Sequence, residues 1–509
     1  MNAFFIAQGI GLDLTIQIIE AMQSKKSLKN IGMYIADEKL YKKYKSKINH
    51  YQSIYEWEII KESLEKSQYS KNLFTGELPN ISSNWEQIIC DRRLIHGSLS
   101  KYYMNYSSDF KLNELISIIT ITENKFFEIF NKIKPEFIFS LGPSIHGARI
   151  AYAISRTLKI PFLTLKSTKI NNILTLGDRD DSIYNHINDK YEEYLSQQNI
   201  PPSTLSYSKK YLFKATNNKA TYEGNKITKY KKNNILKEFL FFSLQFPKAF
   251  IKELIRNKYD LQYSNHIYSL FHRSIGKSIR IEESNNYINA RIIEIDQLKN
   301  LKFAFFALNS EPEIAVDVYS YENRNQIFLA HKIAQSLPLE KILIVKEHPR
   351  SEGVRNPSFY KDLLSMPNIF ISKGSVSQLV KLAEFNIVLS GFAAFESLFA
   401  RKPVITFGNH LLNIIGPPLV WKLTPGNSLK HNIKKIISSN ISDDDFNTKL
   451  IYIISAIKST GIEFNLYSDF FHKLDRDKFK IQNKETIKKQ LNGLIEYLIE
   501  RISQVKKEM

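Results

Sequence analysis

The chain has one cysteine, Cys90, among its 509 residues. A single cysteine excludes an intrachain disulfide and a zinc site built from several thiolates, so we expect a reducing compartment, the cytoplasm. The sequence also has no uninterrupted apolar run of about 18 residues, the length that a membrane-spanning helix needs. The apolar N-terminal stretch has no Lys or Arg before Lys25 and contains Asp13, which favours a strand, a glycine loop and a helix over a signal peptide.

Acidic residues are scarce relative to basic ones, with 51 Asp and Glu against 71 Lys and Arg. Most of the surplus lies in residues 201–280, which contain 16 basic and 4 acidic side chains. The basic residues alternate there with large apolar ones, as in ILKEFLFFSLQFPKAFIKELIRNKY (235–259). This pattern indicates either docking on an anionic membrane surface or a helical insertion with a solvated basic face. Nucleic acid is not an expected partner, because no nucleic-acid module is recognisable.

Short apolar runs alternate with helical patterns in two parts of the chain, which predicts two parallel, doubly wound sheets. We predict a Rossmann-like domain over 1–180, a basic helical insertion over 181–298, a second Rossmann-like domain over 299–420 and a helical tail over 421–509. The predicted strands are 4–7, 31–36, 137–141 and 162–165 in the first domain, and 303–308, 342–345, 386–389 and 404–407 in the second.

The turn after the predicted strand 386–389 has the chemistry of a nucleotide site. Ser390 offers a hydroxyl, Gly391 lets a ligand approach the backbone, and the amides of Phe392 and Ala393 open the helix that follows, as does that of Ala394. Glu396, about one and a half turns later, is placed to accept hydrogen bonds from ribose hydroxyls. The alternative is an ordinary strand-to-helix turn with a solvated glutamate.

A second polar turn follows the buried strand 342–345, with Lys346, His348, Pro349 and Arg350 close together. Pro349 disfavours a helical conformation at His348, so the imidazole lies on a bend at the end of the strand. There it can bind a phosphate or a base, or stabilise the charge of a leaving phosphate, while Lys346 and Arg350 favour an anionic ligand. The alternative for His348 is a structural or surface role.

Two loops of the first domain could face this nucleotide site across a cleft. One contains Gly9, Gly11 and Asp13, of which the glycines permit close approach by a sugar and Asp13 is a candidate general base. The other contains Ser144 and His146, and His146 is a candidate for binding the acceptor or a donor carboxylate. A carboxylate in the first turn of a helix and a histidine at a helix start also occur for structural reasons alone.

Four segments resemble, in order, the bacterial capsule polysaccharide biosynthesis family, which includes Kdo (keto-deoxy-octulosonate) transferases. They are ALNSEPE (307–313), SLPLEKILIVKEHPRSEGVRNPSFY (336–360), PNIFI (367–371) and SVSQLVKLAEFNIVLSGFAAFESLFARKPVITFG (375–408). The resemblance implies a GT-B glycosyltransferase with a nucleotide-sugar donor, often CMP-activated, that acts in the cytoplasm in capsule or surface polysaccharide assembly. It also implies a lipid-linked or polysaccharide acceptor, and the basic block would hold the enzyme beside it at the inner face of the plasma membrane. The resemblance places Glu311 and Glu313 in the cleft, where they could contact a ribose, a sugar or an acceptor hydroxyl, and we take Glu311 as an acceptor ligand. The alternative is a polar cap on the following helix.

We therefore expect glycosyl transfer without an obligatory metal or other cofactor. The nucleotide half has no pair of aspartates in the DxD pattern that holds a metal, and the cluster Asp178, Asp180 and Asp181 lies outside it. Asp13 is the first candidate for the base, ahead of His146 and Glu313. The alternatives are a nucleotide-sugar epimerase, a CDP-polyol phosphotransferase, or a non-catalytic protein that binds membranes or nucleic acid.

Overall fold

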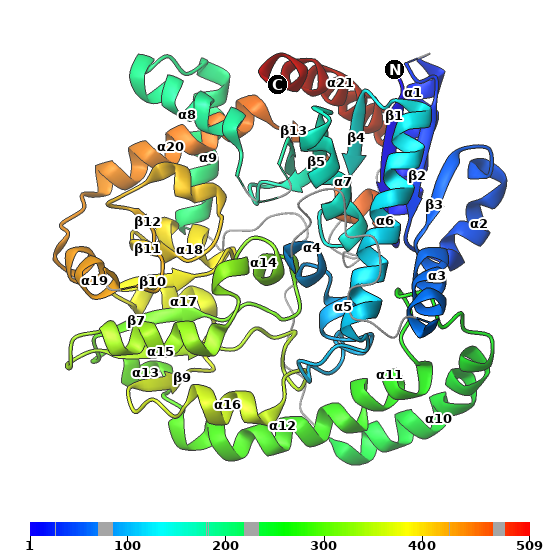
Figure 1. Cartoon of the computed structure of the whole chain (residues 1–509). Helices are drawn as coiled ribbons and strands as arrows, with labels where there is room; N and C mark the ends of the chain where they lie inside the picture. The colour runs from blue at the N-terminus through cyan, green and yellow to red at the C-terminus, as the bar shows by residue number, and fades with distance from the viewer. Residues whose placement is uncertain are drawn as a thin grey trace.

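The computed structural model describes residues 1–509 except 26, 70–84, 180, 182, 218–233, 427 and 472–483. Two sheets form two halves that face each other, with a group of helices along one side of both (Figure 1). Lys231 and Lys232 of the basic block, and Asp180 of the aspartate cluster, lie outside the described residues.

The first sheet has seven strands in the order β3-β2-β1-β4-β5-β6-β13. The parallel strands are β1 (Ala3–Ala7), β2 (Ile31–Ile35), β3 (Gln52–Tyr55), β4 (Phe137–Ser140) and β5 (Phe162–Ser167), and the antiparallel ones are β6 (Ile173–Gly177) and β13 (Ile462–Glu463). Every residue of β1, β2 and β4 is buried, because helices cover both faces of the sheet.

Alternate residues of β1 separate the two cores of this half. Phe5 packs with helices α1 (Gly11–Ser24) and α21 (Lys484–Glu508), and Phe4 packs with the helices of the other face. The remaining helices of this half are α2 (Glu38–Ile48), α3 (Glu56–Tyr69), α4 (Trp85–Ile89), α5 (Arg92–Ile95), α6 (Leu112–Ile133) and α7 (His146–Thr157).

The second sheet has six parallel strands in the order β12-β11-β10-β7-β8-β9. They are β7 (Phe303–Ala307), β8 (Ile342–Lys346), β9 (Ile369–Ile371), β10 (Phe385–Val388), β11 (Val404–Thr406) and β12 (Val420–Lys422). Its helices are α13 (Ile295–Leu298), α14 (Ile314–Asp317), α15 (Gln326–Ser336), α16 (Pro357–Leu363), α17 (Val376–Leu382), α18 (Ala393–Phe399) and α19 (Leu429–Ser438). The strand order reverses between β7 and β10, as it does between β1 and β4 in the first sheet, so both sheets are doubly wound.

The predicted fold class is confirmed: two Rossmann-like sheets face each other in the GT-B manner. Each of the eight predicted strands is present, with its ends displaced by at most two residues. Strands β3, β6, β9, β12 and β13 were not predicted. They have five residues or fewer, and two of them are antiparallel additions to the edge of the first sheet.

The helices of segments 181–298 and 421–509 pack against each other and against the two sheets. Helices α8 (Asn185–Gln197) and α9 (Pro202–Asn217) pack against α20 (Asp443–Thr460), while α10 (Ile235–Leu254), α11 (His266–Arg273) and α12 (Ile275–Ile288) form the group along the lower side of Figure 1. The tail returns to the first sheet through β13 and α21. The division into four segments stays a prediction. Helices α8 and α9 of segment 181–298 share a hydrophobic core with α20 of segment 421–509. Among the described helices, none combines the length and hydropathy needed to cross a bilayer.

Candidate active site between the two sheets

A cavity of about 760 Å³ lies between the carboxyl ends of the two sheets. The first half contributes residues 141–144 after β4 and 165–169 at the end of β5. The second half contributes the turns that follow β7, β8, β9, β10 and β11. Ligands of doubly wound sheets bind at this edge, and the volume is that of a small-molecule site.

Among the described residues that line this cavity, basic side chains outnumber acidic ones. Three glutamates, Glu313, Glu347 and Glu396, face five basic residues, which are Lys166, Lys169, Lys346, Arg350 and Lys373. Lys166 and Lys169 belong to the first half, and the other three belong to the second. An anionic ligand in the cavity therefore meets positive charge from both sides.

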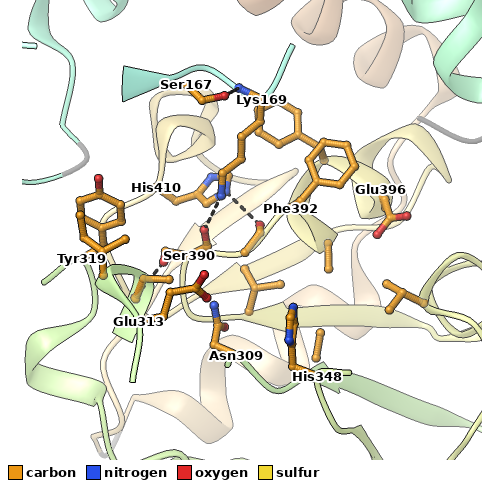
Figure 2. Close-up of a pocket in the computed structure, with 18 of the residues that line it drawn as sticks. Ser167, Lys169, Asn309, Glu313, Tyr319, His348, Ser390, Phe392, Glu396 and His410 are labelled. Atoms are coloured by element: carbon orange, nitrogen blue, oxygen red, sulfur yellow. Dashed lines mark hydrogen bonds between the residues drawn. The ribbon is translucent and has the colours of Figure 1, made fainter. Parts of the chain in front are cut away.

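His348 presents a neutral ring with a defined hydrogen position. Burial, followed by the charges of Arg350, Arg355 and Lys346, lowers the pKa of His348 to about 4. The Nδ1 atom accepts a hydrogen bond of 3.2 Å from the backbone N–H of Arg350. Nε2 therefore carries the ring hydrogen, and His348 can donate it to an oxygen of a ligand in the cavity (Figure 2).

The turn of His348 is fixed from behind by a buried ion pair network around Arg355. This guanidinium is fully buried and lies 2.9 Å from Glu347 Oε2 and 2.5 Å from Glu311 Oε2. It also donates to the carbonyl of Asn309, and Tyr106 donates to Glu311 at 3.0 Å. The carboxylate of Glu311, predicted to contact the acceptor, binds Arg355 and lies outside the cavity lining.

Glu313 occupies the N-cap position of α14, where its side chain makes no capping hydrogen bond, and it lines the cavity. Burial raises the pKa of Glu313, although Arg350 and Lys169 act in the opposite direction. Its Oε1 atom lies 3.6 Å from Nη1 of Arg350, and the side chain keeps 37% of its surface exposed. The result is a carboxylate at the cavity surface, next to a cation from each half.

Lys169 reaches the cavity from the first half (Figure 2). It lies between β5 and β6 at a φ of 64°, and Nζ donates a hydrogen bond of 3.0 Å to the carbonyl of Ser390 in the second half. Burial lowers the pKa of Lys169 to about 8. Lys169 was not predicted as a site residue, because the predicted strand ends at residue 165 and no turn motif marks the hairpin.

The turn after β10 uses part of its hydrogen-bonding capacity internally. Ser390 Oγ donates to the carbonyl of Ala315 at 2.9 Å, and the amide of Ala394 donates to Gly391 at 3.3 Å. Ser390 nevertheless lines the cavity, so its predicted contact with the nucleotide stays a prediction. Gly391 and Glu396 line the cavity, as do Phe392, Ala393, Lys346 and Pro349.

His410 supports the turn from the side. Its Nδ1 accepts the backbone N–H of Leu412 at 3.0 Å, so Nε2 donates to the carbonyl of Gly391 at 3.2 Å. Burial, followed by the charge of Lys169, lowers the pKa of His410 to about 3. This histidine was not predicted, since nothing in the sequence links it to a turn some 20 residues earlier.

His146, predicted to contact the acceptor or a donor carboxylate, lies outside the cavity lining in a second buried network. Its ring is fully buried, with Nδ1 3.0 Å from Asp91 Oδ2 and Nε2 3.3 Å from the hydroxyl of Tyr34. Arg93 joins Asp91 at 2.7 Å to Glu56 at 2.8 Å. Burial acts to raise the pKa of Asp91, but Arg93 and His146 outweigh it and hold that pKa well below its usual value.

Three of these residues, Glu56, Asp91 and His146, bring possible metal-ligand atoms within 4.8 Å of one another. The guanidinium of Arg93 already contacts both carboxylates. Arg93 therefore supplies the positive charge that a metal ion would bring, and we interpret the cluster as a structural ion network.

The loop after β1 also lies behind the cavity. Asp13 accepts a hydrogen bond of 3.0 Å from Gln17 on the same helix and does not line the cavity, nor do Gly9 and Gly11. A Cβ atom on Gly11 would come within 2.8 Å of Leu141, so this glycine allows the two loops to pack closely. Ser144 lines the cavity, whereas Asp13, Gly9 and Gly11 lie outside its lining, so the acceptor contacts expected of these residues stay predictions.

No family model matches the chain, and no curated protein matches it. Similar solved structures include the KpsC beta Kdo 2,7 transferase of Thermosulfurimonas dismutans, with 12% identity, coverage of 67% of this chain and 83% of that chain, and a TM-score of 0.33. They also include a UDP-GlcNAc 2-epimerase from Neisseria meningitidis bound to UDP-GlcNAc, with 11% identity, coverage of 90% and 98%, and a TM-score of 0.27. At these values the similarities carry no argument about activity, and the fold assignment rests on strand order.

Proposed function

We propose that the chain is a glycosyltransferase that takes its sugar from a nucleotide-activated donor. The observation that carries the proposal is the basic cavity between two doubly wound sheets, where His348 and Lys169 approach from opposite halves. The capsule-family resemblance of 307–408 supports a CMP-sugar such as CMP-Kdo as the donor, with no further cofactor. It also supports a place in capsule or surface polysaccharide assembly.

The donor phosphate would bind between His348, Arg350 and Lys169. When the bond between the anomeric carbon and the phosphate oxygen breaks, the electron pair stays on that oxygen and negative charge grows there. The Nε2–H of His348 and the two cations stabilise this charge in a partly dehydrated site. Lys346 adds positive charge, and Glu396 would accept hydrogen bonds from the ribose hydroxyls.

Glu313 is our candidate for the general base. Of the three candidates from the sequence, Asp13 and His146 do not line the cavity, whereas Glu313 does. Its carboxylate would take the proton of the acceptor hydroxyl as the acceptor oxygen bonds to the anomeric carbon. The raised pKa of Glu313 makes it a stronger base than a solvated glutamate.

The acceptor would enter from the side of Ser144 in the first half. We propose a lipid-linked or polysaccharide acceptor and a cytoplasmic enzyme that works beside the inner face of the plasma membrane. These two points rest on the sequence resemblance and on the basic block.

The test is incubation of the full-length protein with a panel of CMP-, UDP- and GDP-sugars, with and without an acceptor glycan. A glycosylated product that forms only with acceptor supports the proposal. Glu313→Gln should lower kcat by about a hundredfold while leaving donor affinity within about twofold. An epimerised sugar without acceptor would indicate an epimerase, and transfer of a polyol phosphate from a CDP-linked donor would indicate a phosphotransferase.

A further inference from the structure

Helix α10 exposes an unusually apolar face to solvent. Its most exposed apolar side chains, and that of the residue that follows it, are Leu236 (77%), Leu240 (62%), Leu244 (78%), Ile251 (60%), Leu254 (71%) and Ile255 (80%). At about 100° per residue these six fall within about 100° of one face of the helix. Soluble surfaces rarely carry so many large apolar side chains in one patch, so this face requires a partner.

The opposite face of α10 is the one that packs against the protein. Phe242 meets the ring of Phe271 in α11 at 6.3 Å, and Ala249 is buried. Both lie about 180° from the exposed stripe by helical spacing. Helix α10 therefore packs on α11 with one face and leaves the apolar stripe exposed on the other. The helix lies at the lower margin of the molecule in Figure 1.

Basic side chains line one border of the apolar stripe. Lys237, Lys248 and Lys252 follow it around the helix, and all three are exposed. The glutamates Glu238 and Glu253 lie toward the packed side, where Glu253 pairs with Arg256. The stripe thus has cations along its edge and no acidic side chain within it.

A pocket of about 250 Å³ opens beside these lysines. Lys248 and Lys252 of α10 and Arg273 of α11 line it together with His266, and none of the described lining residues is acidic. Gln262 also lines the pocket, and its Nε2 atom is buried without a hydrogen-bond partner among the described residues. These groups suit a phosphate oxygen, because each can contribute positive charge or an N–H donor.

We propose that α10 is an interfacial helix that docks the protein on an anionic membrane. Its apolar stripe enters the boundary between headgroups and acyl chains, and the adjacent pocket receives the phosphate of a lipid headgroup. A second copy of the chain fits less well, because a two-fold contact through this face would bring the lysine borders of both copies together. The inference does not depend on the proposed transfer reaction.

The test is flotation of the full-length protein with vesicles of phosphatidylcholine alone and of phosphatidylcholine with phosphatidylglycerol. Binding should require the anionic lipid and should fall between low and physiological salt, where the screening length is about 8 Å. Leu240→Ser/Leu244→Ser/Ile251→Ser and Lys248→Glu/Lys252→Glu should each lower the bound fraction by about tenfold or more.

Two controls match these variants. Lys430→Glu/Lys434→Glu on α19 changes the net charge equally, and Phe213→Ser removes a 71% exposed apolar side chain from α9. Both should bind like wild type, and circular dichroism and nucleotide affinity should be unchanged in all four variants. Equal binding to neutral vesicles, wild-type binding by either α10 variant, or a dimer in solution that the serine variant dissociates would overturn the proposal.

Discussion

His348 and His146 each follow a buried parallel strand, yet the structure uses the two histidines differently. His348 comes two residues after β8, and its turn places the ring in the cavity with one nitrogen fixed by a backbone amide. His146 comes six residues after β4, as the first residue of α7, and its ring is sealed between Asp91 and Tyr34. The partner of a histidine therefore decides its role, and Asp91 is 55 residues away in the sequence.

The largest expected effect is on stability, and it distinguishes His146 from His348. His146→Ala should lower the free energy of unfolding by about 2 to 4 kcal/mol, because it leaves a cavity and deprives Asp91 of a buried partner. Denaturant unfolding gives this value. Transfer activity per folded molecule should stay near wild type, and a folded His146→Ala protein without activity would return His146 to the active site.

His348→Ala should show the reverse behaviour. We expect turnover to fall by about a hundredfold, because the donor to the leaving phosphate is lost, with an unfolding free energy close to wild type. Steady-state kinetics on the donor identified in the panel measures the loss. Full activity in this variant would show that His348 has only a structural role in the turn after β8.

Glu396→Ala tests the ribose contact of the same turn. Loss of the carboxylate should weaken nucleotide binding by about 1 to 3 kcal/mol and leave the fold intact. Calorimetric titration measures it, with Glu384→Ala, outside the cavity lining, as the matched control. Unchanged affinity in folded Glu396→Ala would remove this residue from the site.

A smaller effect should appear in the pH dependence of nucleotide binding. The pKa of Lys169 is lowered to about 8, so its charge is present at pH 7 and is lost as the pH rises through that value. The affinity of wild type should therefore fall by up to about tenfold between pH 7 and 9. A bound anion favours the charged amine and shifts the loss to higher pH in the complex. The nucleotide affinity of Lys169→Arg should not depend on pH in this range. If this variant keeps the pH dependence of wild type, Lys169 does not contact the nucleotide.

The sequence predicts the parallel cores of both sheets well, because continuous apolar runs such as FAFFA (303–307) and ILIV (342–345) mark strands buried on both faces. It also predicts two of the turns that line the cavity from the second half, those after β8 and β10, since polar residues that directly follow such strands lie at the ligand edge. It does not reveal Lys169, whose place depends on a hairpin, or the bond between Glu311 and Arg355, whose residues are 44 positions apart. Long-range contacts leave no local pattern in the sequence. The sequence therefore does not reveal that Glu311 pairs with Arg355 or that His146 contacts Asp91.

Calorimetric titration of the full-length protein with CMP and UDP tests the central claim most directly, with His348→Ala and Arg350→Glu measured in parallel. The account predicts saturable binding of at least one nucleotide at one site per chain. It also predicts that this binding weakens in His348→Ala and weakens further in Arg350→Glu, which reverses a charge in the cavity. Absence of binding to wild type, or binding that neither substitution changes, would contradict a nucleotide site between the two sheets.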